Sequence, residues 1–249
     1  MLLDMLQGYL LIARMSLVSA TLLYTSYLDW KYREVDDKAW IIPGVLAIAL
    51  TVLDLALRWS IDKLFLSILS IGFSSGLAFG FYLLGLYGGA DAKAILIISL
   101  GLPLHRPDRS LHPFTGLATL TNGLVFSLIL PLTILIYNLT QLIKKRDIFE
   151  GFHHESTIRK FFALMFGVRL KNARNRKFWF LMEEADHTRR FKFGLFSLEL
   201  SEIDRDDVWA TPGIPLLIFI TAGFLYYIFI GDVSYTFFRT LLQILNLRT

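Results

Sequence analysis

The sequence contains no cysteine among its 249 residues. This absence excludes disulfide bonds, a thiol nucleophile, thiolate-ligated zinc and iron–sulfur clusters. Charged side chains are also scarce, at 18% of the chain, and no basic run is interleaved with aromatic residues that would stack on bases. Nucleic-acid binding is therefore not expected. The net charge of +4 is ordinary for a membrane protein, whose basic residues gather on one face.

Apolar residues make up 55% of the chain, and its mean hydropathy is +0.54. They form repeated runs with almost no charge, which indicates an all-α membrane protein. We predict about six transmembrane helices, at residues 9–28, 39–57, 64–86, 92–104, 117–137 and 210–231. The fourth run is shorter than the roughly 20 residues that a span needs. Asp4 and Gln7 stand where a signal peptide has basic residues, so the first helix is expected to be retained.

Composition changes abruptly after residue 138. Residues 139–208 hold fourteen Lys or Arg and eleven Asp or Glu, which predicts a water-exposed segment. The expected domains are a transmembrane bundle at 1–138 that carries both key aspartates, a small cytoplasmic α+β domain at 139–209, a sixth transmembrane helix at 210–231 and an interfacial tail at 232–249. Within the soluble domain, the spacing predicts a helix over 156–166 and a hairpin of strands over 177–182 and 190–200.

The distribution of basic residues predicts the orientation. With six spans, the loops after the first, third and fifth share one side and hold eighteen of the 25 Lys and Arg residues. By the positive-inside rule this side is cytoplasmic, and the protein is placed in the cell membrane. Asp29 ends a helix that runs inward and Asp91 starts one that runs outward. Both aspartates are therefore expected at the cytoplasmic face.

The stretch from Tyr87 to Lys93 places Asp91 two residues after the pair Gly88-Gly89, at the start of an apolar run. Ionisable groups in such places tend to mark catalysis or ion paths, and Asp29 is the best partner. Gly88, Gly89 and Ala90 are expected to form a mobile loop, because glycine lets the backbone swing and approach a substrate.

Two carboxylates that share a water cannot both ionise easily, so the pair holds one proton. The ionised carboxylate can then take a proton from water while the protonated one donates to a peptide carbonyl. This chemistry requires no metal and no cofactor, and none is predicted.

Each residue also has a simpler interpretation. Asp91 suits the N-cap of the fourth helix, and Asp29 suits an interfacial charge paired with Arg33 four residues on. Arg33 and Lys93 are considered as electrostatic support for the site, although Lys93 also suits a snorkelling side chain. Gly72, Gly76 and Gly80 recur every fourth residue, which predicts a face for close helix packing.

The motif Gly88-Gly89-Ala90-Asp91-Ala92-Lys93 resembles that of GxGD-type membrane aspartyl proteases, with Ala90 in place of the second glycine. Asp29 followed by Lys31, Arg33 and Val35 resembles the first-aspartate region of type IV prepilin peptidases. The domain before the last span, with residues 209–215, is similar to the archaeal branch, the preflagellin peptidases. Bacterial relatives also have a cysteine-bearing zinc domain associated with N-methylation, which this chain lacks.

The resemblance implies that Asp29 and Asp91 are catalytic and that the substrate is a membrane-anchored archaellin or pilin-like precursor with a short basic leader. Glu34, Asp36 and Asp37 are expected to attract that leader, with small contributions from each. A cation- or proton-coupled transporter that uses the paired aspartates is the alternative, and a structural scaffold is a third interpretation. The bilayer is the other expected partner, and no oligomeric state is predicted.

Overall fold

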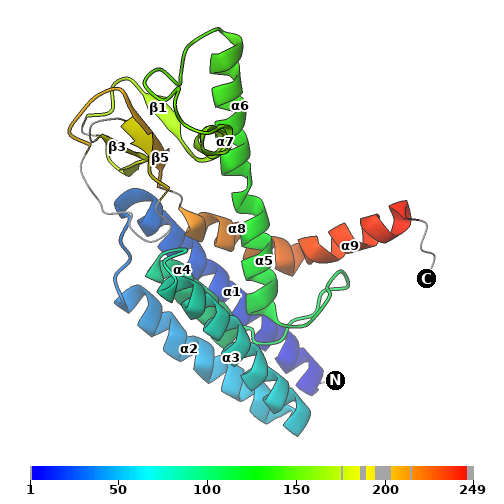
Figure 1. The fold of residues 1–249 in the computed structure, drawn as a ribbon. Coiled ribbons are helices and arrows are strands. Elements are labelled where there is room, and N and C mark those ends of the chain that lie inside the picture. The colour runs from blue at the N-terminus through cyan, green and yellow to red at the C-terminus, as the bar shows by residue number, and fades with distance from the viewer. Residues whose placement is uncertain (1, 175, 186–188, 194–202, 214, 246–249) are drawn as a thin grey trace. The chain divides into compact units, whose positions relative to one another are not determined.

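The computed structural model describes residues 2–174, 176–185, 189–193, 203–213 and 215–245, which form nine helices and five strands. They divide into two compact units. We call Met1–Phe126 with Pro215–Thr249 the helical unit, and Ser127–Ile214 the mixed unit. Figure 1 shows the elements of both units with their labels. The proposed boundaries at 138, 209 and 231 stay predictions.

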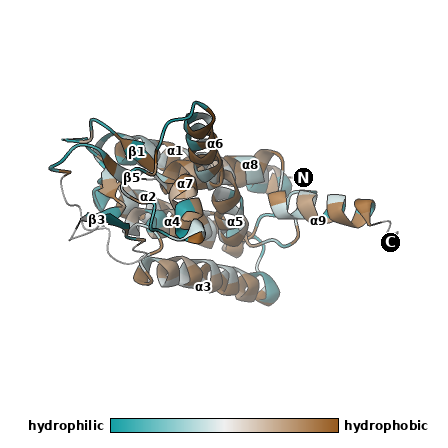
Figure 2. Cartoon of the chain, turned by 45° about the horizontal axis from the view of Figure 1, so that its top comes forward, coloured by the Kyte–Doolittle hydropathy of each residue, from teal (hydrophilic) through white to brown (hydrophobic). Residues whose placement is uncertain are grey.

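The helical unit consists of seven helices among the described residues, most of them apolar. They are α1 (Leu2–Tyr32), α2 (Lys38–Leu57), α3 (Ile61–Leu83), α4 (Gly89–Gly101), α5 (Thr115–Ser127), α8 (Leu216–Phe229) and α9 (Val233–Ile244). Short loops join α1 to α2 and α2 to α3. The exposed side chains of these helices are largely hydrophobic. Brown and pale colours dominate their ribbons in Figure 2, where brown marks hydrophobic residues.

Four described stretches are long and apolar enough to cross a membrane: α1, α2, α3 and Thr115–Ile143. A fifth is present if α8 and α9, which are bent by 65° at their junction, count as one broken span. The prediction of six spans is therefore not confirmed. The difference lies in α4, which has only 13 residues and at about 1.5 Å per residue is too short to cross.

The predicted fifth span is present but broken. It consists of α5 and α6 (Ile129–Ile143), which are separated by a turn at Leu128. Pro131 explains the break, because proline has no N–H to donate to the carbonyl four residues earlier.

The short helix α4 contacts α1, α2, α3 and α8, so it lies inside the helical unit. Its apolar side chains point in every direction and are buried, among them Ala92, Ile95 and Ile98. A helix that is hydrophobic all round is a core helix, and this burial fixes the position of the residues at its N-terminus.

In the described part of the chain, no other residue packs closely on the expected glycine face of α3. A Cβ added at Gly72, Gly76 or Gly80 would meet nothing within 4 Å. The close crossing lies instead between α5 and α8, where a Cβ on Gly223 would come within 2.6 Å of the Gly123 nitrogen. Sequence spacing alone could not tell a packed glycine face from an open one.

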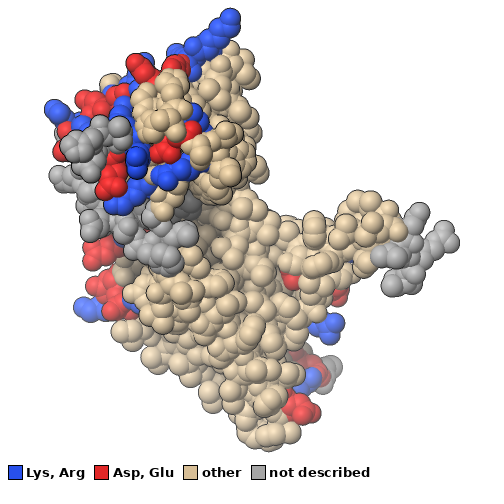
Figure 3. Space-filling view, in the orientation of Figure 1, with Lys and Arg blue, Asp and Glu red and all other residues tan. Residues whose placement is uncertain are grey.

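The mixed unit contains α6, α7 (Thr157–Phe166) and five short strands: β1 (Val168–Leu170), β2 (Trp179–Leu181), β3 (Glu183–Ala185), β4 (Arg189–Phe191) and β5 (Val208–Pro212). Three strands form an antiparallel sheet in the order β1–β5–β2, and β3 pairs with β4. Its core stacks Phe152 on Phe191, with ring centroids 4.4 Å apart. Charged side chains crowd the surface of this unit in Figure 3.

The helix predicted over 156–166 is confirmed by α7, whose N-cap Ser156 accepts a hydrogen bond from the Arg159 N–H. In the described residues the predicted hairpin is displaced toward its expected connection, and the Lys192 N–H donates to the Met182 carbonyl at 2.8 Å. Strand β2 pairs with β5, while β3 forms inside the expected connection and pairs with β4. Alternation identified strand segments, but only the sheet decides which of them are neighbours. The expected strand residues 194–200 lie outside the described residues.

Candidate active site

Asp29 lies in the last turn of α1, because the helix continues to Tyr32 instead of ending at residue 28. The turn is closed by Arg33, whose φ of 58° is left-handed and whose N–H donates to the Asp29 carbonyl at 3.0 Å. This is the αL cap that glycine usually provides. A residue with a side chain costs about 1 kcal/mol there, so arginine occupies a position that local conformation alone would not favour.

Contacts with α8 fix the rotation of this end of α1. The Ser26 hydroxyl lies 2.7 Å from the Thr221 hydroxyl and donates to the Leu217 carbonyl at 3.2 Å. Both hydroxyls are buried. Ser26 lies three residues before Asp29, and positions three apart share a face of a helix. The contacts therefore hold the half-buried Asp29 at the α8 side of the helical unit.

Asp91 lies in the first turn of α4, at the third helical position. The expectation that it is the N-cap is corrected, because Gly88 holds that position and the helix begins at Gly89. The Asp91 carboxylate accepts the Gly88 N–H at 3.0 Å, which satisfies one of the free donors of the helix start. Its side chain is buried, with 8% exposure.

The expected mobile loop is partly helical in this structure. Gly88 is extended, while Gly89 and Ala90 already belong to α4. Before them, the Tyr87 hydroxyl donates to the Ala78 carbonyl at 2.8 Å and ties the loop to α3. The mobility of Gly88, Gly89 and Ala90 stays a prediction.

The two carboxylates lie within electrostatic reach of each other. Asp91 is outside the four candidate spans, and its pKa is raised to about 7. Burial is the main cause, and the negative charge of Asp29 adds to it. The Gly88 hydrogen bond and the positive charge of Arg33 act in the opposite direction. The topology expected from sequence, with both aspartates at one end of the bundle, thus agrees with the structure.

The acidic residues between α1 and α2 are exposed. Asp37 forms an ion pair with Lys93, which gives that lysine a partner on the neighbouring loop. The Asp36 carboxylate accepts the Lys38 N–H at 2.7 Å at the start of α2. Glu34 is exposed in the same loop. These residues surround the end of α1 that holds Asp29, but exposed pairs contribute little energy.

Sequence reasoning did not recognise a second charged cluster in the helical unit. Arg14 is 4% exposed and forms an ion pair with Asp54, which also pairs with Lys63; both distances are 2.9 Å. The Arg14 Nε donates to the Gly101 carbonyl at the end of α4 at 2.7 Å. Arg14 precedes Asp29 by fifteen residues, or about 22 Å of helix, so the cluster lies far from the two aspartates. The sequence did contain a signal for this cluster, because Arg14 lies inside an apolar run, where a charged side chain usually has a partner.

The arrangement suits proton transfer between a carboxyl group and a water. A buried carboxyl group that keeps its proton near neutral pH can donate it, and a neighbouring ionised carboxylate can accept one. Among the residues that the structure describes, no three His, Asp or Glu side chains lie together as metal ligands would.

Comparisons with known proteins identify the family of the chain. The model of the type IV leader peptidase family matches residues 16–139, which include α1 from Ser16 onward and all of α4. A second model, for the archaeal peptidase A24 C-terminus type II, matches residues 152–233. The two ranges together cover most of the chain and both aspartates.

Two curated relatives are similar over most of their length. A preflagellin peptidase of Methanococcus maripaludis is 26% identical over 226 residues, which cover 85% of this chain and 92% of the relative. A preflagellin peptidase of Methanocaldococcus jannaschii is 24% identical over 225 residues, with 85% and 91% covered. The resemblance seen in the motifs around Asp29 and Asp91 is confirmed: the chain belongs to the type IV leader peptidase family of membrane proteases.

Proposed function

We propose that this protein is an aspartic endopeptidase that removes a short basic leader from an archaellin or pilin-like precursor. The observation that carries the proposal is the buried Asp91, whose raised pKa keeps a proton available beside the carboxylate of Asp29. The peptidase family of the chain and the names of its relatives support this substrate class.

In the proposed mechanism, Asp29 acts as the general base and Asp91 as the general acid. Asp29 takes a proton from a water as the water oxygen attacks the scissile carbonyl carbon. Asp91 donates its proton to the carbonyl oxygen, which gives a neutral tetrahedral diol. The carbon–nitrogen bond then breaks, the leaving amine receives the proton held by Asp29, and a diol hydroxyl returns its proton to Asp91. No covalent intermediate and no cofactor takes part.

We place the site at the cytoplasmic face of the cell membrane. A precursor anchored by its apolar segment presents its leader at that interface, and the exposed Glu34, Asp36 and Asp37 give the leader's Lys and Arg side chains an acidic surface to approach. Because Asp37 already pairs with Lys93, most of this attraction falls to Glu34 and Asp36.

The test is co-expression with a tagged precursor, with leader removal measured as a mobility shift. Asp29→Asn and Asp91→Asn should each abolish cleavage, because the amide preserves shape but cannot share the proton. Asp36→Asn and Asp37→Asn are matched controls that remove one nearby carboxylate each and should keep most of the activity. Near-normal turnover by Asp29→Asn or Asp91→Asn would overturn the mechanism. The transporter alternative has no support, since the matched families and relatives are peptidases.

A further inference from the structure

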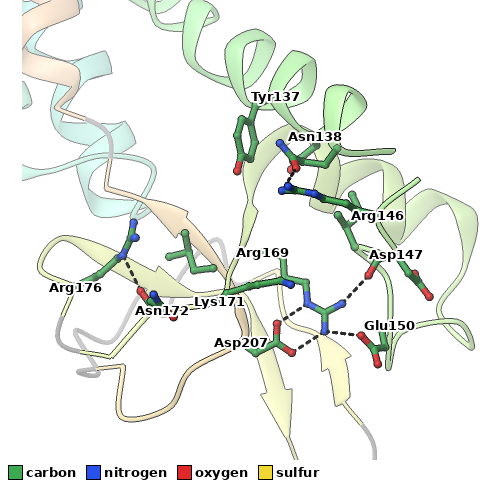
Figure 4. A pocket seen from close by; sticks show the side chains of 13 residues that line it. Tyr137, Asn138, Arg146, Asp147, Glu150, Arg169, Lys171, Asn172, Arg176 and Asp207 are labelled. Atoms are coloured by element: carbon green, nitrogen blue, oxygen red, sulfur yellow. Dashed lines mark hydrogen bonds and ion pairs between the residues drawn. The ribbon is translucent and has the colours of Figure 1, made fainter. Parts of the chain in front are cut away.

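A hollow lined only by described residues lies wholly within the mixed unit. It has a volume of about 900 Å³, which is the size of a small-molecule site. It is lined by the last turns of α6, the loop that starts at Arg146, the stretch from β1 to Arg176, and Asp207 just before β5. Figure 4 shows these side chains around the pocket.

The acidic side chains of the pocket are already engaged. The Asp207 carboxylate accepts two hydrogen bonds from the Arg169 guanidinium, at 2.7 and 2.6 Å. Glu150 lies 3.6 Å from the same guanidinium, and Asp147 lies 3.1 Å from His153. Because Arg169 forms ion pairs with Asp207 and Glu150, its guanidinium is not available to pair with an anionic ligand.

Three other basic side chains line the pocket without a carboxylate partner in the described part of the chain. Arg146 donates to the Gln141 side-chain oxygen at 2.8 Å, and Arg176 donates to the Asn172 carbonyl at 2.9 Å. Lys171 forms no ion pair with any described residue. The lining holds four basic side chains against three acidic ones, so the net charge of the pocket is positive, which favours an anionic ligand.

The place of the pocket along α6 indicates the source of that anion. This helix is the second half of the candidate span Thr115–Ile143, and its apolar residues Ile136 and Ile143 are 62% and 80% exposed. The pocket begins at Tyr137, only about 9 Å of helix before Ile143. Lys144, Lys145 and Arg146 follow directly. An aromatic residue at the rim and basic residues just past an apolar span are typical of the lipid headgroup layer.

We propose that this pocket binds the phosphate-bearing headgroup of an anionic phospholipid, with Arg146, Lys171 and Arg176 contacting the phosphate. The acyl chains run along the exposed apolar side of α6. All residues that line this pocket belong to the mixed unit, whereas both aspartates belong to the helical unit, so neither aspartate is part of the pocket.

The test uses the purified full-length protein in neutral detergent and three soluble probes: short-chain phosphatidylglycerol, short-chain phosphatidylcholine and inorganic phosphate. Phosphatidylglycerol should bind, while the other two should not saturate. The triple variant Arg146→Gln/Lys171→Gln/Arg176→Gln should bind phosphatidylglycerol on the order of 100-fold more weakly, at about fivefold for each basic residue lost.

The matched control is Lys177→Gln/Arg190→Gln/Lys192→Gln, which removes the same charge from exposed positions of the mixed unit outside the pocket. It should bind like the parent. Equal losses in the two variants would show non-specific surface attraction and overturn the site. Saturable phosphate binding would make it a small-anion site and overturn the lipid. If the triple variant does not fold, Lys171→Gln alone must lose about fivefold.

Discussion

At the scale of single residues, Asp91 is the most informative side chain. Burial at the start of a core helix and the nearby charge of Asp29 both oppose its ionisation, whereas an exposed aspartate ionises near pH 4. The Gly88 N–H and Arg33 limit the shift, so the pKa remains close to neutral. A carboxyl group with this pKa can both hold a proton and release it under physiological conditions.

The pH dependence of cleavage should follow this pKa. Because Asp91 must be protonated to donate, activity should fall as the pH rises through about 7. Arg33 lowers the pKa of Asp91, so Arg33→Gln should move this decline to higher pH. The measurement is the initial rate of leader removal across pH with purified enzyme.

Lys93→Gln is the matched control for Arg33→Gln, since Lys93 pairs with the exposed Asp37 and is not among the groups that shift Asp91. Its pH profile should overlay that of the parent. A decline that moves to lower pH in Arg33→Gln would contradict the assigned role of Arg33.

At the scale of elements, α4 is a short helix whose far end is tied down by polar contacts. Its last carbonyls have no partner within the helix. Arg14 donates to the Gly101 carbonyl, Thr51 donates to the Leu100 carbonyl at 2.7 Å, and Ser70 donates to the Pro103 carbonyl at 2.6 Å. These bonds hold α4 at one depth in the helical unit and thereby set the depth of Asp91.

Arg14→Gln should lower the free energy of unfolding by about 3 kcal/mol. Among the described residues, the substitution leaves the largely buried Asp54 paired with Lys63 alone, and it weakens the contact with α4. The measurement is denaturant unfolding in mixed micelles. Arg58→Gln is the control, since Arg58 pairs with Asp4 at the surface and should change stability by less than about 1 kcal/mol. Similar losses in both variants would show that the buried cluster has no special role.

At the scale of the whole molecule, charge is distributed unevenly between the two units. Fourteen of the 25 basic residues lie in residues 139–208, and in Figure 3 charged side chains are densest on the mixed unit, with smaller groups on the helical unit. The positive-inside rule therefore predicts that this unit lies in the cytoplasm. The loop between α2 and α3 is expected on the opposite side of the membrane.

Cysteine labelling tests this orientation without background, since the parent has no cysteine. A cysteine at the exposed His154 should react with an impermeant maleimide only after cells are permeabilised. A cysteine at the exposed Asp62, at the start of α3, should react in intact cells. The reverse pattern would show that the orientation is inverted, and labelling of both would refute a single orientation.

The sequence by itself determined the class of the protein and the two positions worth testing. A long apolar run that lies in a bilayer forms a helix, because its backbone N–H and C=O groups find no water there and must form hydrogen bonds within the segment. The motif around Asp91 and the region after Asp29 identified the family, and chain direction placed both aspartates at one end of the bundle. These conclusions depend on composition and connectivity, which are properties of the chain itself.

Only the tertiary structure decided which residues are neighbours. It showed that α4 is a buried core helix of 13 residues, that Asp91 accepts the Gly88 N–H instead of capping the helix, and that Arg33 ends α1 in a left-handed conformation. It also moved the close glycine crossing from α3 to Gly123 and Gly223, and paired β2 with β5. The spacing of apolar residues shows which face of its helix or strand a residue occupies, but not which element packs against that face. Burial, which raises the pKa of Asp91, arises only when the helices pack.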